Sequence, residues 1–311
     1  MSPAARKSKD TFSWWQDRIR ILKGFQEEAN TLYERTHFAY EVGPQAILKL
    51  GLLAYYLKVY TTIIKSNFPK AYYADLFAGP GLTKIETTGD VVLGSAVLAD
   101  RVPSEGRKFD KLFLIEHQNE AAEALKQILR GATVMNQDAN TVNLETLLGA
   151  DTKFSIPTLG FVDPEGMDPN WTVLEPLLDR WSDVIINYQA HAVRRAAGRA
   201  SEPQYAQAMT RFFGVDEWQN CKSDQDYLAL YCKRIGKYKQ IIITTKVRGH
   251  GGFFYYVIVA VKKTRGNQDW IDAIERAKTN VEKAGPNLIE QLLRIYKGEQ
   301  STLNHYPDFL L

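Results

Sequence analysis

The stretch Ala71–Gly81, AYYADLFAGPG, decides the fold predicted for this chain. A short apolar run ends in an acid, Asp75, and the chain then turns through Gly79, Pro80 and Gly81. Because glycine has no Cβ and tolerates positive φ, such a turn lets the backbone approach a ligand closely. In open α/β sheets, ligands bind at the carboxyl ends of the strands, where Asp75 is expected. The stretch therefore predicts a cofactor loop, and a purely structural tight turn is the alternative.

Two kinds of cofactor suit such a loop. A pyrophosphate needs the pattern Gly-x-Gly-x-x-Gly opening directly into a helix, whose N-terminus meets the negative charge. Here the third glycine is missing, and LTKIETTGDVVL intervenes before the next predicted helix, which begins near Ser95 with Ser95 as its N-cap. S-adenosylmethionine (SAM) carries no phosphate but has a charged amino-acid end and a ribose. An acid beside a glycine turn therefore favours SAM over a nicotinamide dinucleotide.

Size and composition set the general class. The chain has 311 residues, a net charge of +3 and two cysteines, Cys221 and Cys232. It is long enough for one large α/β domain with helical additions. Its weak positive charge is compatible with a local basic rim. The cysteines indicate neither a disulfide framework nor a metal site, no run reaches the roughly 20 apolar residues that span a bilayer, and MSPAARKSKDTF lacks a signal-peptide core. We expect a soluble, cytoplasmic protein with no membrane contact and no metal.

Four apolar runs that alternate with helical patterns each deliver an acid at their carboxyl end, as expected of a parallel sheet. The carboxyl ends of parallel strands share one edge, so these acids are predicted to surround a single site. The runs are YYADLF with Asp75, KLFLIE ending in Glu116, ATVMNQD ending in Asp138, and TLGFVDPEG with Asp163.

Each acid has a predicted role in holding an adenosine-like ligand. Glu116 can accept both ribose hydroxyls, as the equivalent acid does in dinucleotide sites, although it follows Gly81 by 35 positions rather than about 20. A solvated strand end is its alternative. Asp138 can reach the adenine amine, or can belong to a turn with a helix cap at Asn140 or Thr141.

The substrate side is predicted from the residues that follow the fourth and later strands. Asp163 can hold a nucleophilic amine or accept its proton. Trp171 can stack a flat substrate ring, with packing as the alternative. A basic segment after the fifth strand and the VRGHGG turn can position phosphates, with a solvated charge run as the alternative. The predicted substrate-binding set is Trp171, Arg194, Arg195, Arg248 and His250.

The last two β-rich runs flank VRGHGG and predict a hairpin, so that the final strand is antiparallel. The predicted fold is therefore α/β: a Rossmann-like, mostly parallel sheet of seven strands, which is the class I methyltransferase plan, with N-terminal, inserted and C-terminal helices. The expected organisation is a disordered tail over 1–10, helices packing on the sheet over 11–70, the methyltransferase-like domain over 71–266 with a helical excursion over 203–237, and a helical tail over 267–311.

Taken together, these motifs resemble the three-Cys-motif partner protein family, usually called TcmP, a branch of the class I SAM-dependent methyltransferase fold. The resemblance covers most of the chain, with a looser likeness to ribosomal RNA adenine-N6 methyltransferases. It rests on DLFAGPG at Asp75–Gly81, GSAVLA at Gly94–Ala99, FLIE ending at Glu116, FVDPEG at Phe161–Gly166, RFFG at Arg211–Gly214 and YYVIVAVKKTRG at Tyr255–Gly266.

The resemblance implies methyl transfer from SAM to an acceptor oriented by Asp163 and Pro164. The two basic segments expected at the rim of the sheet predict nucleic acid as the substrate, with RNA favoured over DNA. The resemblance also implies genomic pairing with a three-cysteine radical-SAM-like protein. The cofactor-binding set is Asp75, Phe77, Gly79, Gly81, Glu116 and Asp138.

The sequence leaves three hypotheses for the function, of which a SAM-dependent methyltransferase is the first. Gly166 stands where base amino-methyltransferases carry a stacking aromatic ring, which favours a second function: a non-catalytic nucleic-acid-binding or partner protein that retains the SAM-binding fold. A nicotinamide-dependent dehydrogenase is the third hypothesis, and the missing third glycine disfavours it.

Overall fold

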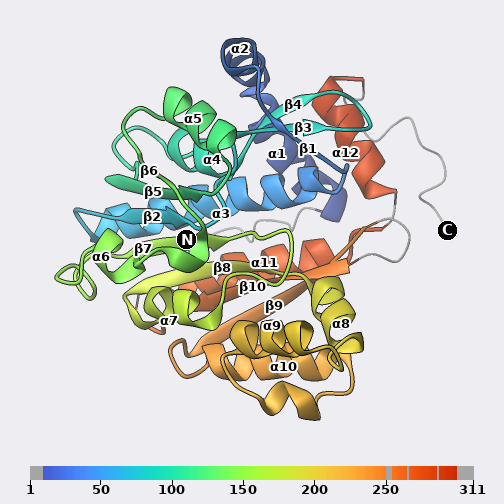
Figure 1. Cartoon of the computed structure of the whole chain (residues 1–311). Coiled ribbons are helices and arrows are strands. Elements are labelled where there is room, and N and C mark those ends of the chain that lie inside the picture. The colour runs from blue at the N-terminus through green and yellow to red at the C-terminus, as the bar shows by residue number, and fades with distance from the viewer. Residues whose placement is uncertain (1–9, 250–253, 265, 286, 300–311) are drawn as a thin grey trace, which may run out of the picture.

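The computed structural model describes residues 10–249, 254–264, 266–285 and 287–299 (Figure 1). The predicted substrate residue His250 lies outside the described residues. So do nearly all of the predicted N-terminal tail and residues 300–311 of the C-terminal tail.

A seven-stranded sheet forms the centre of the molecule, in the order β6-β5-β2-β7-β8-β10-β9 (Figure 1). The first five of these strands are paired in parallel, and β10 is antiparallel to both of its neighbours, β8 and β9. The predicted fold class, a mostly parallel seven-stranded sheet whose last strand is antiparallel, is confirmed. The strands are β2 (Tyr72–Asp75), β5 (Lys111–Glu116), β6 (Thr133–Asn136), β7 (Thr158–Val162), β8 (Ser182–Tyr188), β9 (Ile241–Arg248) and β10 (Phe254–Val261).

The register between strands determines how far each terminal acid extends. Asp75 pairs with Leu114 of β5 on one side and with Phe161 of β7 on the other. Glu116 and Asp163 each lie two residues beyond these partners, which is about 6–7 Å farther along the strand direction. The acids at the strand ends therefore do not lie at one level, and Asp75 is the deepest of these three.

Alternating side chains of the strands divide the apolar residues into two cores. Tyr73 points into one core, whereas Tyr72 and Ala74 point into the other. The first core is covered by α1 (Thr11–Lys23), α2 (Gln26–Thr36), α3 (Ala46–Asn67), α4 (Ser95–Arg101), α5 (Asn119–Ile128), α11 (Gln268–Glu282) and α12 (Leu288–Lys297). The second is covered by α6 (Leu144–Leu148), α7 (Trp171–Asp179), α8 (Ala190–Gly198), α9 (Pro203–Phe213) and α10 (Asp224–Ile235), with the short 3-10 turns η1 (Ala139–Thr141) and η2 (Glu217–Asn220).

The N-terminal helix α1 and the C-terminal helix α11 meet on the first of these faces. The indole Nε1 of Trp15 in α1 donates to the carbonyl of Asn280 in α11 at 3.2 Å. Helix α3 crosses between them and is long and apolar enough to span a membrane by composition, but 67% of its most apolar window is buried inside the protein. Its apolar surface is therefore used largely as core.

A second, three-stranded sheet occupies the segment between the glycine turn and α4. It consists of β1 (Tyr40–Val42), β3 (Leu82–Ile85) and β4 (Val91–Leu93), with β3 parallel to β1 and antiparallel to β4. The sequence predicts no strand in residues 82–93, LTKIETTGDVVL, which separate the glycine turn from the helix near Ser95. They form a hairpin instead, because their two short apolar runs are joined by a turn in which Gly89 has a φ of +72°. The hairpin brings the N-terminal strand β1 alongside the glycine turn.

Candidate cofactor and acceptor site

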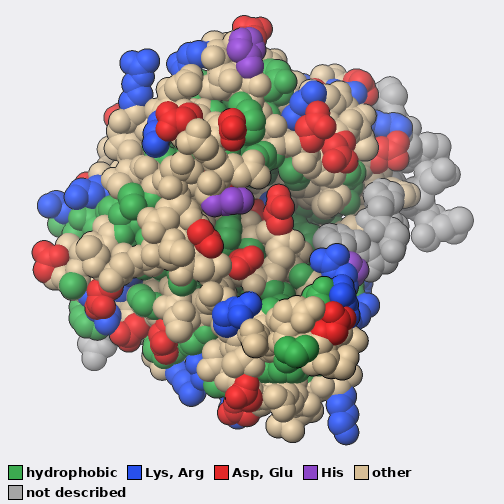
Figure 2. All heavy atoms as spheres, in the orientation of Figure 1, with side chains coloured by type: hydrophobic (Ala, Val, Ile, Leu, Met, Phe, Trp, Pro, Cys, Tyr) green, Lys and Arg blue, Asp and Glu red, His purple; other side chains and the backbone are tan. Residues whose placement is uncertain are grey.

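A cavity of about 550 Å³ lies beyond the carboxyl ends of β2, β5, β6 and β7. Its size falls within the range of roughly 300–1,000 Å³ that is usual for small-molecule sites. Residues from each of these strand ends line it, as do Tyr40 of β1 and Lys49 of α3. On the face of the molecule shown in Figure 2, acidic side chains and a histidine gather near the middle, and most of the lysine and arginine side chains lie farther out.

The glycine turn forms one wall of this cavity, and its two glycines meet different surroundings. Gly79 and Gly81 have φ values of +61° and +83°. A Cβ on Gly81 would lie 2.8 Å from Cγ2 of Val97 in α4, so this glycine allows the turn to pack against the helix. A Cβ on Gly79 would meet only the ring of Tyr40, at 3.4 Å. Both predicted glycines line the cavity.

Asp75, predicted to contact the cofactor, has a different position. Its side chain is completely buried and is not among the residues that line the cavity. It accepts hydrogen bonds from the Tyr73 hydroxyl at 3.1 Å, the Phe77 amide at 3.2 Å and the Ser95 hydroxyl at 2.7 Å. Contrary to the prediction, the sheet register places Asp75 one layer below the cavity and outside its lining. Asp75 instead ties β2, the glycine turn and α4 together.

Burial raises the pKa of Asp75 to about 7, and the nearby carboxylate of Asp163 contributes in the same direction. The three hydrogen-bond donors only partly offset this effect.

Ser95 is the residue that connects Asp75 to the cavity. It was predicted to be an N-cap, but the cap of α4 is Gly94 and Ser95 is the first helical residue. Its hydroxyl binds Asp75, while the residue itself lines the cavity. The sequence signal that could have identified it is the Gly-Ser pair that follows the hairpin.

Glu116 lines the cavity, as its predicted role requires. Its side chain is 4% exposed, and its oxygens accept from the amide of Gly79 at 3.0 Å and the amide of Gln118 at 2.8 Å. The Tyr40 hydroxyl donates to it at 3.1 Å, and Nδ1 of His117 lies 3.3 Å away. The alternative of a solvated strand end is therefore wrong, and Glu116 links the glycine turn to the next strand.

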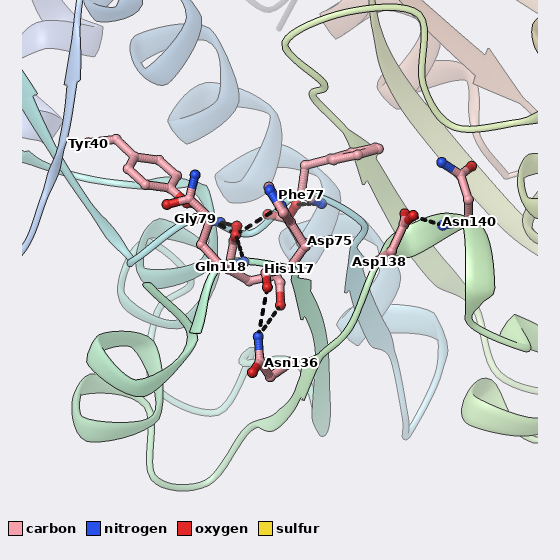
Figure 3. Close-up of polar contacts among 10 residues, drawn as sticks. Tyr40, Asp75, Phe77, Gly79, His117, Gln118, Asn136, Asp138 and Asn140 are labelled. Carbon is pink, nitrogen blue, oxygen red and sulfur yellow. Dashed lines mark hydrogen bonds and ion pairs between the residues drawn. The ribbon is translucent and has the colours of Figure 1, made fainter. Parts of the chain in front are cut away.

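Tyr40 is a site residue that the sequence analysis missed. Its ring lies over Gly79 and its hydroxyl holds Glu116, so it covers the part of the cavity where these two residues meet (Figure 3). Burial and the Glu116 carboxylate raise the pKa of Tyr40 above its ordinary value, so the hydroxyl remains a donor. No local pattern points to this contact, because β1 reaches the site by pairing with β3.

Asp138 lies at the cavity, and the turn that follows it is capped by Asp138 rather than by the predicted Asn140 or Thr141. As the N-cap of η1, Asp138 accepts at Oδ1 from the Asn140 amide at 2.9 Å. Asn140 also lines the cavity and donates from Nδ2 to Asp168 at 3.0 Å. Phe77, predicted as a cofactor residue, lines the cavity, and its ring extends away from Gly79 on the side of Asp138 and Asn140 (Figure 3).

The predicted acceptor residues, Asp163 and Pro164, both line the cavity. Oδ2 of Asp163 forms an ion pair with Nζ of Lys49 at 2.5 Å, and Oδ1 accepts from Nδ2 of Asn187 at 2.6 Å. The carbonyl of Pro164 accepts from Nε2 of Gln189 at 3.3 Å. Lys49, from a helix far upstream in the sequence, was not predicted to belong to the site.

The predicted substrate-binding residues that the structure describes do not line the cavity. Trp171 is a correction: its side chain is 2% exposed and packs against Tyr231 in the second core, with the Arg234 guanidinium over its ring. It cannot stack a substrate, because the first residue of α7 faces the core. Arg194, Arg195 and Arg248 are exposed outside the cavity lining, and Arg194 is paired with Asp224.

Within the part of the chain that the structure describes, no group of three or more His, Cys, Asp or Glu side chains is arranged to hold a metal ion.

Comparison with known proteins gives structural relatives only. No known protein family and no curated protein sequence matches the chain. Among solved structures, protein LPL1258 from Legionella pneumophila is 11% identical with a TM-score of 0.47, covering 75% of this chain and 94% of its own. An rRNA methylase from Streptococcus thermophilus is 12% identical with a TM-score of 0.36, covering 67% and 94%. The plantazolicin methyltransferase BamL, solved with S-adenosylhomocysteine (SAH), is 13% identical with a TM-score of 0.38, covering 96% and 94%.

Proposed function

We propose that this chain is a SAM-dependent methyltransferase. The observation that carries the proposal is the position of Glu116: a nearly buried carboxylate that lines a cavity of about 550 Å³ beside the positive-φ glycine Gly79. In nucleoside-binding sheets, ribose hydroxyls are held by a carboxylate at the end of the strand that follows the glycine-turn strand in the central sheet. In this chain that strand is β5, which ends in Glu116. The glycine turn is followed by β3 rather than by a helix, so it offers no helix N-terminus to a pyrophosphate. This favours SAM over a nicotinamide dinucleotide.

The lining residues fit the three parts of such a ligand. The backbone of Gly79 and Gly81 suits the methionine end of SAM. A side chain at position 79 would cover this backbone. Glu116 suits the ribose, and Asp138 with Asn140 offers polar atoms for adenine. Bound SAM would supply an electrophilic methyl group, so the chain has to supply alignment and exclusion of water. Asp163 and Pro164, which also line the cavity, are proposed to orient the acceptor.

We further propose that the acceptor is in nucleic acid, with RNA favoured over DNA. The support is the set of exposed basic residues on α8 and at the end of β9, Arg194, Arg195 and Arg248, which can contact phosphates. Membership of the TcmP family, a cytoplasmic location and a three-cysteine radical-SAM-like partner are proposals of the same rank. They rest on the motifs from DLFAGPG to YYVIVAVKKTRG.

Two measurements test the proposal. Calorimetry with SAM and SAH reports cofactor binding, and transfer of a labelled methyl group from SAM to total RNA and total DNA reports catalysis. We expect binding of SAH, and label in RNA above that in DNA. Quenching of protein fluorescence by NADH, with no binding of SAM or SAH, would overturn the proposal in favour of a dehydrogenase.

A second function is kept because of one observation at the acceptor position. Both oxygens of Asp163 already accept from the protein's own side chains, and Gly166 supplies no ring to stack a base. A nucleic-acid-binding or partner protein that binds SAM without transferring its methyl group would have the same features. Tight SAH binding with no transfer to RNA, DNA or protein would support this second function.

A further inference from the structure

A cation and a carboxylate lie side by side at the acceptor end of the cavity. Nζ of Lys49 and Oδ2 of Asp163 are 2.5 Å apart, and both residues line the cavity. Their side chains are 27% and 15% exposed, so a ligand in the cavity can reach both. The pair joins two elements that are far apart in the sequence, the first turn of α3 and the end of β7. The acceptor end therefore presents one donor next to one acceptor.

Buried groups behind the pair fix its orientation. Asn187 of β8 is 5% exposed and donates to Oδ1 of Asp163 at 2.6 Å. A small apolar hollow lies beneath, lined by Lys49, Leu52, Tyr56 and Asn187 among others. Oδ1 of Asn187 and the hydroxyl of Tyr56 are buried beside it without a hydrogen-bond partner. Asn187 thus holds Oδ1 of Asp163, while the Asp163 side chain stays 15% exposed and lines the cavity.

Hydrogen-bonding capacity remains on both members of the pair. An ionised carboxylate offers about four lone-pair sites, and Asp163 uses two in the interactions with Lys49 and Asn187. An ammonium has three N–H donors, and one points at Asp163. A ligand can therefore receive a hydrogen bond from Lys49 and donate one to Asp163 without breaking the ion pair.

We propose that the Lys49–Asp163 pair recognises an amino-substituted nitrogen heterocycle by its edge: the ring nitrogen accepts from Lys49 and the adjacent exocyclic amine donates to Asp163. This proposal rests on the proposed methyltransferase function and specifies its substrate. Among the nucleobases, adenine and cytosine present a ring nitrogen acceptor beside an amino donor on their pairing edge. Uracil has no amine. Guanine presents a protonated ring nitrogen beside its amine on the pairing edge, and places its N3 acceptor beside the amine only on the sugar edge. Lys49 is thus a specificity-determining residue, and the exocyclic amine is the methyl acceptor.

The transfer step balances with SAM as the only co-reactant. The lone pair of the amine forms the new N–C bond to the methyl carbon, the C–S bond breaks, and its electron pair stays on sulfur. The amine loses one proton, which leaves to solvent by way of the Asp163 carboxylate. Hydrogen bonds to Asp163 and Lys49 fix the plane of the ring, so that the amine faces the methyl group.

The first part of the test identifies the product. RNA and DNA labelled with tritiated methyl groups are digested to nucleosides, and we expect label on the exocyclic amine of adenosine or cytidine. Label on an oxygen, on a ring atom, in guanosine or uridine, or in protein would overturn this inference while leaving the methyltransferase function intact. If SAH does not bind, or binds without any transfer, the proposed function fails and the inference falls with it.

The second part tests whether Lys49 reads the ring nitrogen, in the wild-type protein and in a Lys49 variant. With SAH present, calorimetry compares an RNA oligonucleotide carrying the target base with one whose ring nitrogen is replaced by C–H. We expect about a 10- to 100-fold loss of affinity in the wild type, because a hydrogen bond to a charged group is lost. In Lys49→Met the two oligonucleotides should bind within about 2-fold of each other.

The matched controls separate recognition from cofactor binding and from folding. Lys49→Met should leave the affinity for SAH within about 3-fold, and Lys49→Arg should retain discrimination because it keeps a cationic donor. Lys84→Met removes another partly exposed lysine, ion-paired with Glu41 outside the cavity lining, and should discriminate as the wild type does. A loss of SAH affinity confined to Lys49→Met would assign Lys49 to the cofactor and overturn the proposal. So would equal binding of both oligonucleotides by the wild type.

Discussion

Asp75 and Glu116 end two neighbouring strands, yet only Glu116 lines the cavity. Asp75 pairs across the sheet with Leu114, so Glu116 extends two residues farther toward the cavity. Asp75 is enclosed by Tyr73, the Phe77 amide and Ser95, whereas Glu116 lines the cavity beside Gly79. Two acids in equivalent sequence positions thus serve different purposes. One positions the turn, and the other is placed to meet the ligand.

The largest effect expected from this comparison is on stability. Because the folded protein raises the pKa of Asp75 from 3.8 to about 7, the native state binds one more proton than the unfolded state between about pH 4 and pH 7. The contribution of Asp75 to the free energy of unfolding therefore falls as pH rises through this window, by a few kcal/mol. The difference in unfolding free energy between wild type and Asp75→Asn, measured in urea at pH 4.5, 6 and 8, should show this slope. A difference that does not change with pH would contradict the buried position.

The next largest effect separates the two glycines of the turn. Gly81→Ala should cost about 2 kcal/mol or more of stability, because it combines a strained positive φ with a Cβ 2.8 Å from Val97. Gly79→Ala has the same backbone strain but meets only the Tyr40 ring, so its cost should be smaller. Its loss should appear mainly in SAH affinity. Urea denaturation and calorimetry of both variants test this order, and equal losses of stability would contradict it.

A third prediction compares the two carboxyls in ligand binding. Glu116→Gln should weaken SAH binding about 10- to 100-fold, since a charged acceptor for hydroxyl donors becomes neutral. Asp75→Asn should weaken SAH binding less than Glu116→Gln does, because Asp75 positions the turn but does not line the cavity. Calorimetry at pH 8 measures both. If the two variants lost affinity equally, the distinction between positioning and contact would not hold.

The smallest effect concerns Tyr40. The Tyr40 hydroxyl donates a hydrogen bond to Oε1 of Glu116 at 3.1 Å, so it competes with any ribose hydroxyl for this oxygen. Tyr40→Phe removes this competitor and keeps the ring over Gly79, so SAH affinity should rise by a factor of about 2 to 5. Calorimetry on the Phe variant is the measurement. Weaker binding would show that the hydroxyl helps to hold the ligand.

The features that the sequence predicted correctly depend on local patterns. Apolar runs ending in acids identified the parallel strands, and the two β-rich runs around VRGHGG predicted the antiparallel last strand. Glu116 and Asp163 were correctly expected at the cavity, because each ends or directly follows such a run.

The features that the sequence did not predict depend on contacts between elements that are far apart along the chain. The depth of Asp75 follows from strand register, which no single run encodes. Tyr40 and Lys49 reach the site from β1 and α3, through contacts far apart in the sequence. Trp171 was misplaced because its sequence position could not show that the first turn of α7 faces the second core.

A crystal structure of the protein with SAH would show directly which residues hold the ligand. We expect ribose hydroxyls within hydrogen-bonding distance of Glu116, the homocysteine end against Gly79 and Gly81, and the sulfur facing the Lys49–Asp163 pair, with Asp75 out of contact. SAH bound elsewhere, or bound through Asp75 with Glu116 still held by Tyr40, would contradict this expectation.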